Sequence, residues 1–192
     1  RSWGRSSSLF DEKSESIENR FNVDLDGIEY DAKFVFETVG YNLEGNEVGA
    51  SFGMAQLSKL DSNIKTRQDN FKRQCNFFAK HKKFFSNPVE SGAFNTAWLA
   101  FPILINEDAP FSRREFQIYL EERNIQTRVV FTGNILRQPM CANIEKRVMD
   151  SGYPNADAVM KRGVLLPLHH GLSEDMFVRL HSTIEEFISS YK

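Results

Sequence analysis

The side chains that most often bind metals or act as nucleophiles are few in this sequence, and their spacing matches no known catalytic pattern. His169 and His170 are adjacent, so on any strand they point to opposite faces, while His81 and His181 are isolated. The sequence has no nucleophile elbow, phosphate-binding P-loop or dinucleotide-binding glycine motif. A Cys/His nucleophile pair stays open as an alternative, although no spacing supports it. The residues alone therefore predict an α/β domain without a recognisable catalytic centre.

The composition predicts a protein with a substantial core and no general attraction to polyanions. Of the 192 residues, 41% are hydrophobic and 17 are Phe, and the 24 basic and 26 acidic residues give a net charge of −2. A chain without a strong positive field is not drawn to nucleic acid or to an anionic membrane surface. The basic run at residues 80–83 lies at a predicted helix C-terminus, where it complements the helix dipole. We therefore expect neither a nucleic-acid partner nor a membrane partner.

The cysteines and the absence of targeting signals indicate a cytoplasmic protein. Cys75 and Cys141 lie in unrelated contexts and form no CxxC motif, which fits a reducing compartment. Neither a signal peptide nor an apolar run of about 20 residues is visible, and such a run would be needed to span a membrane. The chain starts at Arg1 rather than at Met, so we expect further sequence ahead of it in the natural protein.

Residues 34–60 organise the chain, because a Gly-Tyr-Asn turn there leads into a long helix. Asn46 is a suitable N-cap and Glu47 a suitable first-turn acid. Apolar residues then recur at helical spacing, which predicts one unbroken helix from Asn46 to about His81. Gly49 and Gly53 lie one turn apart in this helix, although glycine destabilises a helix interior by about 1 kcal/mol relative to alanine. They indicate a face approached closely by a ligand or another backbone, or else tight packing of a buried helix.

Turn and capping signals predict the remaining elements. Asp26-Gly27 between alternating apolar residues predicts a β-hairpin. Ser112 and Glu115 form a capping box, with a helix expected to run to about Arg123, and Ser173 caps the last helix. Pro102 lacks an N–H, so its strand should be at an edge or contain a bulge. The other predicted elements are strands at residues 98–105, 125–131 and 164–168 and a short helix at residues 154–160, which together form a small α/β domain.

Several motifs together resemble one enzyme family. GYN at residues 40–42 precedes a small-residue helical run that ends in AQLSKL at 55–60. RSWGR, WLAFPI, IQTRVVFTGNILRQP and PNADAVM…LLPLHHGLS occur at 1–5, 98–103, 125–139 and 154–173. This order resembles the DegT/DnrJ/EryC/StrS sugar aminotransferase family, whose vitamin B6-dependent members act on nucleotide-linked keto-deoxy sugars. The resemblance covers almost the whole chain, but only the C-terminal half of a family member.

The resemblance implies an α/β fold, the C-terminal part of a fold-type I aminotransferase-like enzyme. Residues 1–62 would be a remnant of the large cofactor domain, with the hairpin, the GYN turn and the start of the long helix. Residues 63–192 would be the small C-terminal α/β domain. The full-length protein would be a homodimer with pyridoxal phosphate. The alternative is a non-catalytic dimerisation or binding module that reuses this half of the fold.

The resemblance also implies the cofactor contacts. Asn42 would hydrogen-bond the cofactor phosphate of the neighbouring subunit, because an amide NH₂ and nearby helix-terminal N–H groups suit an anion. The alternative is that Asn42 only takes a turn conformation. Tyr41 would pack beside the cofactor or under the turn. Glu44 departs from the family, whose members usually carry a basic residue there.

Substrate residues follow from the same resemblance. Arg128, Phe131, Asn134 and Gln138 would line the nucleotide-sugar pocket, where an arginine fork suits a diphosphate and an aromatic face suits a sugar or base. The alternatives are a surface ion pair for Arg128 and a core position for Phe131.

The catalytic lysine, or the histidine that replaces it in the dehydratases, should lie upstream of Arg1. We therefore expect no catalytic residue in this chain and no activity of the chain alone. The segment TRVVFTGNILRQP looks closest to the branch that removes the 3-hydroxyl of a 4-keto-6-deoxyhexose. One subgroup of that branch carries an iron–sulfur cluster between WGR and GYN, but residues 6–39 contain no cysteine. Amino transfer and cluster-free 3-dehydration both stay open.

Overall fold

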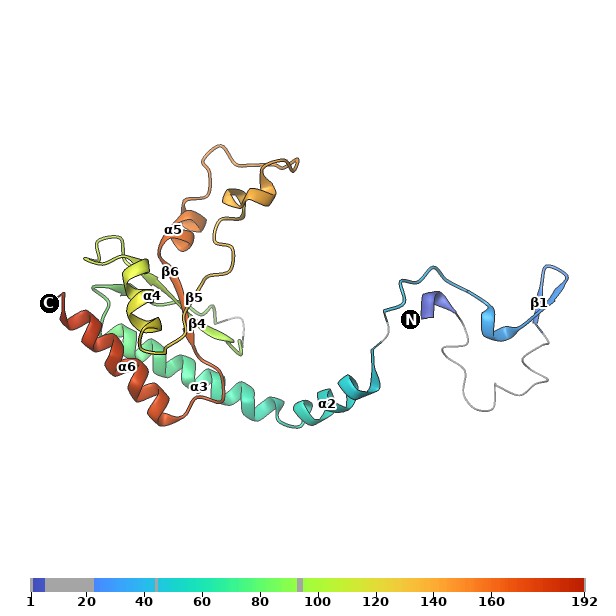
Figure 1. Ribbon diagram of the computed structural model, residues 1–192, viewed down its shortest axis with the longest axis horizontal. Coiled ribbons are helices and arrows are strands. Elements are labelled where there is room, and N and C mark those ends of the chain that lie inside the picture. The colour runs from blue at the N-terminus through green and yellow to red at the C-terminus, as the bar shows by residue number, and fades with distance from the viewer. Residues whose placement is uncertain (1, 6–22, 44, 93–94, 192) are drawn as a thin grey trace. The chain divides into compact units, whose positions relative to one another are not determined.

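The chain folds into two units, Arg1–Ser58 and Lys59–Lys192. The computed structural model describes residues 2–5, 23–43, 45–92 and 95–191 (Figure 1). The division lies four residues before the predicted boundary at 62/63. The assignment of the first unit to a large cofactor domain stays a prediction.

The first unit contains the hairpin that the Asp-Gly pair predicts. Strands β1 (Val23–Leu25) and β2 (Ile28–Tyr30) pair antiparallel, with Leu25 opposite Ile28. Asp26 and Gly27 both have positive φ, 55° and 86°, as a two-residue turn that matches the twist of its strands requires. The Gly27 N–H donates to the Asp24 carboxylate at 2.9 Å, which further fixes the turn.

The glycine of the GYN turn packs directly against the start of the chain. A Cβ on Gly40 would lie 2.6 Å from the Gly4 nitrogen, and one on Gly4 would lie 1.8 Å from the Thr38 carbonyl oxygen. The Glu37 N–H donates to the Gly4 carbonyl at 3.1 Å, and Arg5 forms a β-bridge with Phe36. The motifs WGR and GYN are far apart in the sequence, yet their glycines lie so close together in the fold that neither position has room for a Cβ.

The single long helix that the sequence predicts is in fact two helices, α2 (Glu47–Leu57) and α3 (Leu60–Ala79). The prediction is wrong at residues 58–59, where Lys59 has ψ −4°. The Ser58 hydroxyl donates to the Ala55 carbonyl at 3.0 Å and the Ser62 hydroxyl to the Lys59 carbonyl at 2.9 Å. Serine side chains that bond to backbone carbonyls compete with the helical ladder, which favours an interruption here.

The predicted N-cap of α2 is confirmed, since the Asn46 side-chain oxygen accepts from the Gly49 N–H at 2.6 Å. No residue of α2 is buried by the described part of the chain. A Cβ on Gly53 would meet nothing within 4 Å, so the close approach that Gly53 suggests is not made by the described residues.

The second unit is built on a four-stranded antiparallel sheet with the order β3-β4-β6-β5. Its strands are β3 (Phe85–Ser86), β4 (Ala100–Ile105), β5 (Arg128–Val129) and β6 (Gly163–Pro167). The three predicted strands do share one sheet. Strands β4 and β5 are shorter than predicted, β6 begins and ends one residue earlier than predicted, and β3 was not predicted. Pro102 pairs with Leu165 of β6, while β3 reaches only Leu104 and Ile105. The other edge of β4 is therefore open at Pro102, as a residue without an N–H requires.

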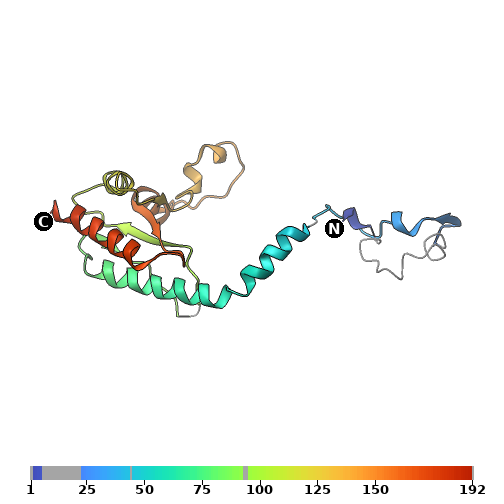
Figure 2. The same cartoon turned by 60° about the horizontal axis from the view of Figure 1, so that its bottom comes forward.

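Helices α3 and α6 (Glu174–Ser189) lie side by side along one face of this sheet, and α4 (Arg113–Glu121) packs against α6 (Figures 1 and 2). Rings from all three helices and from the sheet form the core. Phe116 of α4 lies 5.3 Å from both Phe85 and Phe187, centroid to centroid. The predicted apolar stripe of α6 is buried: Phe177, Leu180, Ile184, Phe187 and Ile188.

The predicted caps of these helices are present. The Ser112 hydroxyl accepts from the Glu115 N–H at 3.2 Å, and the Glu115 carboxylate accepts from the Ser112 N–H at 2.7 Å. Helix α4 ends at Glu121, two residues before the predicted end, and Asn124 then takes a left-handed φ of 58°. The Ser173 hydroxyl accepts from the Met176 N–H at 3.3 Å, which caps α6. Within the described ranges, no helix combines the length and apolar character that crossing a membrane requires.

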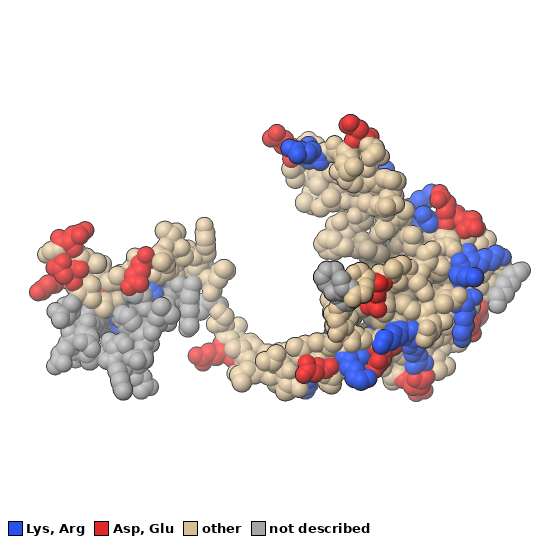
Figure 3. Space-filling view, turned by 180° about the vertical axis from the view of Figure 1, so that it is seen from behind, with Lys and Arg blue, Asp and Glu red and all other residues tan. Residues whose placement is uncertain are grey.

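Helix α5 (Pro154–Arg162) precedes β6, and the chain between β5 and α5 contains the short helices η4 (Ile135–Arg137) and η5 (Pro139–Cys141). On the face of the second unit that Figure 3 shows, basic and acidic side chains are interspersed. This distribution agrees with the near-neutral net charge and gives that face no continuous basic surface.

Candidate functional site

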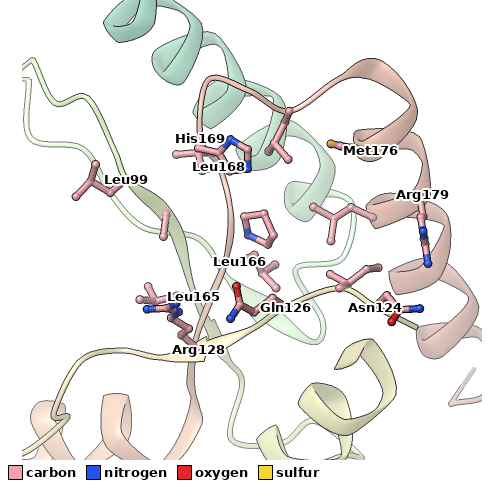
Figure 4. Close-up of a pocket in the computed structure, with 15 residues that line it drawn as sticks. Leu99, Asn124, Gln126, Arg128, Leu165, Leu166, Leu168, His169, Met176 and Arg179 are labelled. Carbon is pink, nitrogen blue, oxygen red and sulfur yellow. The ribbon is translucent and has the colours of Figure 1, made fainter. Parts of the chain in front are cut away.

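A cavity of about 530 Å³ in the second unit lies between strands β5 and β6 and the first half of α6 (Figure 4). Its floor is apolar, with leucines from both the sheet and the helix. Arg128, Arg179 and His169 also line it, and the described lining residues include no carboxylate. The full lining is Leu99, Ala100, Asn124, Ile125, Gln126, Arg128, Leu165, Leu166, Pro167, Leu168, His169, Leu172, Met176, Arg179 and Leu180.

The two arginines of this cavity differ in freedom. Arg179 is tied down, because its Nη2 donates to the Arg123 carbonyl at 2.6 Å. Arg128 on β5 is exposed and makes no ion pair with the residues that the structure describes. The surface ion pair considered for Arg128 is therefore not formed within the described chain. An unpaired guanidinium beside an apolar floor suits an organic anion with an apolar body.

His169 is at the upper rim of the cavity in Figure 4. Its Nδ1 accepts from the Gly171 N–H at 3.1 Å, and its carbonyl accepts from the Asn70 amide at 3.1 Å. Asn70 belongs to α3, so the loop that carries His169 is tied to that helix. The hydrogen bonds of His169 therefore have a structural role, because they fix the loop after β6.

Phe131 and Gln138 line a second, smaller cavity of about 120 Å³ together with Gly133 and Met160. The Phe131 side chain is 87% exposed, and its φ is 39°. The alternative of a core position for Phe131 is therefore wrong. The Gln138 amide donates to the Thr132 carbonyl at 3.0 Å and so closes the loop on itself.

Asn134 uses its polar atoms inside the protein. The side chain is only 7% exposed. Its Nδ2 donates to Oδ1 of Asp157 at 2.7 Å, and its Oδ1 accepts from the Leu136 N–H at 3.1 Å. The same carboxylate of Asp157 binds Arg137 through two nitrogens. Sequence reasoning missed Arg137 and Asp157, because the pair is 20 residues apart and carries no local signal.

Asn42 and Tyr41, the predicted cofactor contacts, belong to the first unit. Asn42 has a φ of 57°, the left-handed turn conformation that asparagine adopts readily. Its side chain is exposed and forms no hydrogen bond with the described residues, and Tyr41 is 81% exposed. Asn42 therefore takes the turn conformation and still leaves its amide available. Glu44 lies outside the described residues.

Metal and thiol chemistry find no support in the described part of the chain. The residues there contain no cluster of three or more His, Cys, Asp or Glu side chains that could hold a metal ion. Burial raises the pKa of the Cys75 thiol, with a smaller contribution from Glu90, so the thiol stays neutral. A neutral thiol is a poor nucleophile, which removes the basis for a Cys75/His pair.

Comparison with known proteins decides the family. Residues 10–185 match the sequence model of the DegT/DnrJ/EryC1/StrS aminotransferase family. The chain belongs to this family.

Two curated family relatives cover nearly the whole chain. Lipopolysaccharide biosynthesis protein RfbH of Salmonella typhimurium is 29% identical over 189 residues, 97% of this chain and 43% of that protein. The dTDP-4-dehydro-2,6-dideoxy-D-glucose 3-dehydratase of Saccharopolyspora spinosa is 30% identical over 191 residues, 98% of this chain and 41% of that protein. The chain thus spans about two fifths of the length of these relatives.

Solved structures agree with the family assignment. The E. coli GDP-4-keto-6-deoxy-D-mannose-3-dehydratase with bound hydrated PLP matches with a TM-score of 0.70 and 25% identity, over 78% of this chain and 38% of that one. The aminotransferase from Psychrobacter cryohalolentis matches with a TM-score of 0.74 over 98% of this chain and 47% of that one. Its 17% identity supports the fold alone. The predicted family and the α/β, aminotransferase-like fold class are confirmed.

Proposed function

We propose that this chain is the C-terminal part of a pyridoxal phosphate-dependent enzyme that acts on a nucleotide-linked 4-keto-6-deoxy sugar. The observation that carries the proposal is the family match over residues 10–185, together with a relative named as a sugar 3-dehydratase that covers 98% of the chain. Several similar proteins have names that refer to GDP- or dTDP-linked sugars, among them a GDP-4-keto-6-deoxy-D-mannose 3-dehydratase and a dTDP-4-amino-4,6-dideoxy-D-glucose transaminase.

The residues present fit the phosphate of the cofactor. When bound, pyridoxal phosphate supplies an electron sink for bonds next to the substrate nitrogen. The Asn42 amide, exposed and without a hydrogen-bond partner in the described chain, would donate to the phosphate in the neighbouring subunit. The N-terminus of α2 follows four residues later and carries free N–H groups that favour an anion. Tyr41 would pack beside the cofactor.

The substrate would contact the second unit. Arg128 would bind the diphosphate, because its guanidinium is unpaired within the described chain and borders an apolar cavity. Phe131 would offer its exposed ring to the sugar or base, with Gln138 beside it. Asn134 would contribute through the shape of this loop, since its own polar atoms are bonded within the protein.

The reaction is either amino transfer or 3-dehydration without an iron–sulfur cluster. Residues 6–39 contain no cysteine, so this stretch cannot supply the thiolates that hold such a cluster. The lysine or histidine that would choose between the two reactions is expected upstream. We propose that the chain alone is inactive and that the full-length enzyme is a cytoplasmic homodimer.

The alternative is a non-catalytic dimerisation or binding module. The exposed apolar side chains of α2, Val48, Phe52 and Leu57, suit association in either case and do not distinguish the two proposals. Visible absorbance distinguishes the two proposals, because only the enzyme retains the cofactor.

The test compares this chain with the intact gene product. Both are incubated with pyridoxal phosphate, L-glutamate and a dTDP- or GDP-4-keto-6-deoxyhexose, and the products are analysed by mass spectrometry. We expect the intact protein to retain the cofactor through gel filtration and to form an amino sugar or a 3-deoxy sugar, and the chain alone to do neither. Turnover by the chain alone would overturn its proposed inactivity. A colourless, inactive intact protein would favour the binding module.

A further inference from the structure

Asp157 of α5 joins two segments of the second unit that lie about 20 residues apart in the sequence. Its Oδ1 accepts from Arg137 Nε at 2.5 Å and from Asn134 Nδ2 at 2.7 Å. Its Oδ2 accepts from Arg137 Nη2 at 2.7 Å. One carboxylate therefore receives three hydrogen bonds, two of them from a guanidinium fork. We call Asn134, Arg137 and Asp157 the clasp.

The clasp holds the loop at residues 130–138, which follows β5. Asn134 also N-caps η4, because its Oδ1 accepts from the Leu136 N–H at 3.1 Å. Gln138 closes the same loop by donating to the Thr132 carbonyl at 3.0 Å. Phe131, near the start of this loop, is 87% exposed. The loop therefore carries an exposed aromatic ring, and hydrogen bonds of Asn134 and Gln138 fix its backbone.

The loop also packs tightly against α5, the helix that carries Asp157. Gly133 has a φ of 61°, and a Cβ there would lie 2.4 Å from Cβ of Met160. Met160 is itself held, since its carbonyl accepts from Arg113 Nη1 of α4 at 2.6 Å. The path of the loop is therefore set by α5 at two points, the Gly133–Met160 contact and the clasp.

The charge of the clasp persists over the whole working range of pH. The hydrogen bonds from Arg137 first, and from Asn134 second, lower the pKa of Asp157 to about 2. A carboxyl group whose folded pKa is depressed stabilises the folded state above its ordinary pKa and loses that contribution as the pH falls toward 2. Asp157 is therefore ionised near neutral pH, and the clasp does not act as a pH switch there.

We propose that Asp157 is a positioning residue. It fixes the loop 130–138, and through the loop it sets the direction of Phe131 and Gln138 toward the substrate. This substrate role rests on the function proposed above. In this role Asp157 acts through the loop and not through a contact of its own with substrate or cofactor. The alternative is that Asp157 stabilises the folded state but leaves the affinity for the substrate unchanged.

The first test uses the intact protein without substrate and measures backbone amide hydrogen exchange. We expect Asp157→Ala to speed exchange in residues 130–138 by about tenfold, because a buried Asn134 amide loses its acceptor. Exchange in α6 should not change. The matched control is Asp150→Ala, an exposed acid seven residues earlier with no ion pair among the described residues. Unchanged exchange in the loop of the Asp157→Ala variant would overturn the positioning role.

The second test uses the intact enzyme and its nucleotide-sugar substrate. We expect Asp157→Ala and Arg137→Ala each to raise KM by about tenfold while kcat stays within about twofold, as lost substrate orientation at the binding step predicts. The double variant should be no worse than Asp157→Ala alone, because Asp157→Ala already removes the contact with Arg137. An unchanged KM in either single variant would reduce the clasp to a stability anchor and overturn the substrate role.

The two tests separate this inference from the function on which it rests. If the unaltered enzyme turns over no nucleotide sugar, the proposed function fails and takes the substrate role of Asp157 with it. Loop exchange still decides whether the clasp fixes residues 130–138, since that measurement needs no substrate. Asp157→Glu provides a conservative comparison, in which a restored charge should recover part of the exchange protection.

Discussion

The imidazole Nε2 of His181 lies 2.8 Å from the side-chain oxygen of Gln74, a residue with no solvent exposure. The Gln74 amide donates in turn to the Pro167 carbonyl at 3.3 Å, so one side chain links α3, α6 and the end of β6. The His181 ring also stacks on Phe77, with 3.9 Å between the ring centroids. This polar contact lies beside the aromatic core, where a positive charge on the ring is poorly solvated.

The environment of His181 predicts a pH-dependent stability. Burial, and then the positive charges of Arg73, Lys80 and His81, lower the pKa of His181 to about 4, and Glu174 opposes this shift only partly. As the pH falls below about 6.5, the His181 side chain takes up a proton in the unfolded state but stays neutral in the folded state until about pH 4. The free energy of unfolding is therefore highest above pH 6.5 and falls as the pH drops toward 4. The loss should be on the order of 2–3 kcal/mol.

Urea unfolding of the chain between pH 7.5 and pH 4 measures this effect. His181→Gln keeps a polar side chain but removes the titration, so its unfolding free energy should depend less on pH over that range. The matched control is His170→Gln, because His170 is exposed. Equal pH profiles for His181→Gln and the unaltered chain would refute the assignment.

Removing Arg73 should lower the free energy of unfolding more than removing its ion-pair partner Glu174. Arg73 binds Glu174 through both terminal nitrogens, at 2.5 and 2.6 Å, and its guanidinium carbon lies 4.4 Å from the centroid of the Phe177 ring. Glu174 is exposed, so Glu174→Ala should change stability little and mainly remove salt dependence. Arg73→Ala should cost about 0.5–1 kcal/mol more, because it also loses the ring contact. Urea unfolding at low and high salt tests this, and equal losses in the two variants would contradict it.

Asn42 predicts a cofactor effect without a folding effect in the intact enzyme. Because Asn42 has a φ of 57°, Asn42→Gly keeps the backbone conformation while removing the amide. We expect cofactor binding to weaken by roughly 1.5–3 kcal/mol, the contribution of a hydrogen bond to a charged group. Asn42→Asp should be worse, because a carboxylate would face a phosphate dianion.

Cofactor dissociation, followed by visible absorbance, measures the Asn42 variants. Glu44→Arg adds a test at the neighbouring position: it should tighten cofactor binding if Glu44 faces the phosphate and leave it unchanged if Glu44 faces solvent. Unchanged affinity in both Asn42 variants would remove this residue from the site and leave GYN as a structural turn.

The exposed apolar side chains of α2 predict self-association of the isolated chain. Val48 is 82% exposed, and Phe52 and Leu57 are each 68% exposed. Burying such side chains is worth about 1.5–3 kcal/mol each. Sedimentation should show association that rises with concentration, and Phe52→Ser should reduce it. Val89→Ser is a suitable control, since Val89 is 92% exposed but lies in the second unit. A monomer at high concentration would contradict this prediction.

Local chemistry made much of the fold predictable from the sequence. The Asp26-Gly27 turn, the Ser112 capping box and the N-caps at Asn46 and Ser173 depend on atoms within a few residues of each other. Such interactions form in the same way wherever the segment lies. The ordered motifs likewise pointed to the family, because each keeps its own residues together in the chain.

The tertiary structure decided the features that join distant residues or that local patterns describe poorly. The apolar period continued through residues 58–59, yet the helix breaks there, because hydrophobic spacing does not register serine hydroxyls that bond to backbone carbonyls. Asn134 had the right type for a substrate contact, yet its amide binds Asp157, 23 residues away. Gln74 and His181 are 107 residues apart, and only the packing of α3 on α6 brings them together. The sequence by itself determined turns, caps and family, whereas packing decided which polar side chains are already bonded within the fold and which still face solvent.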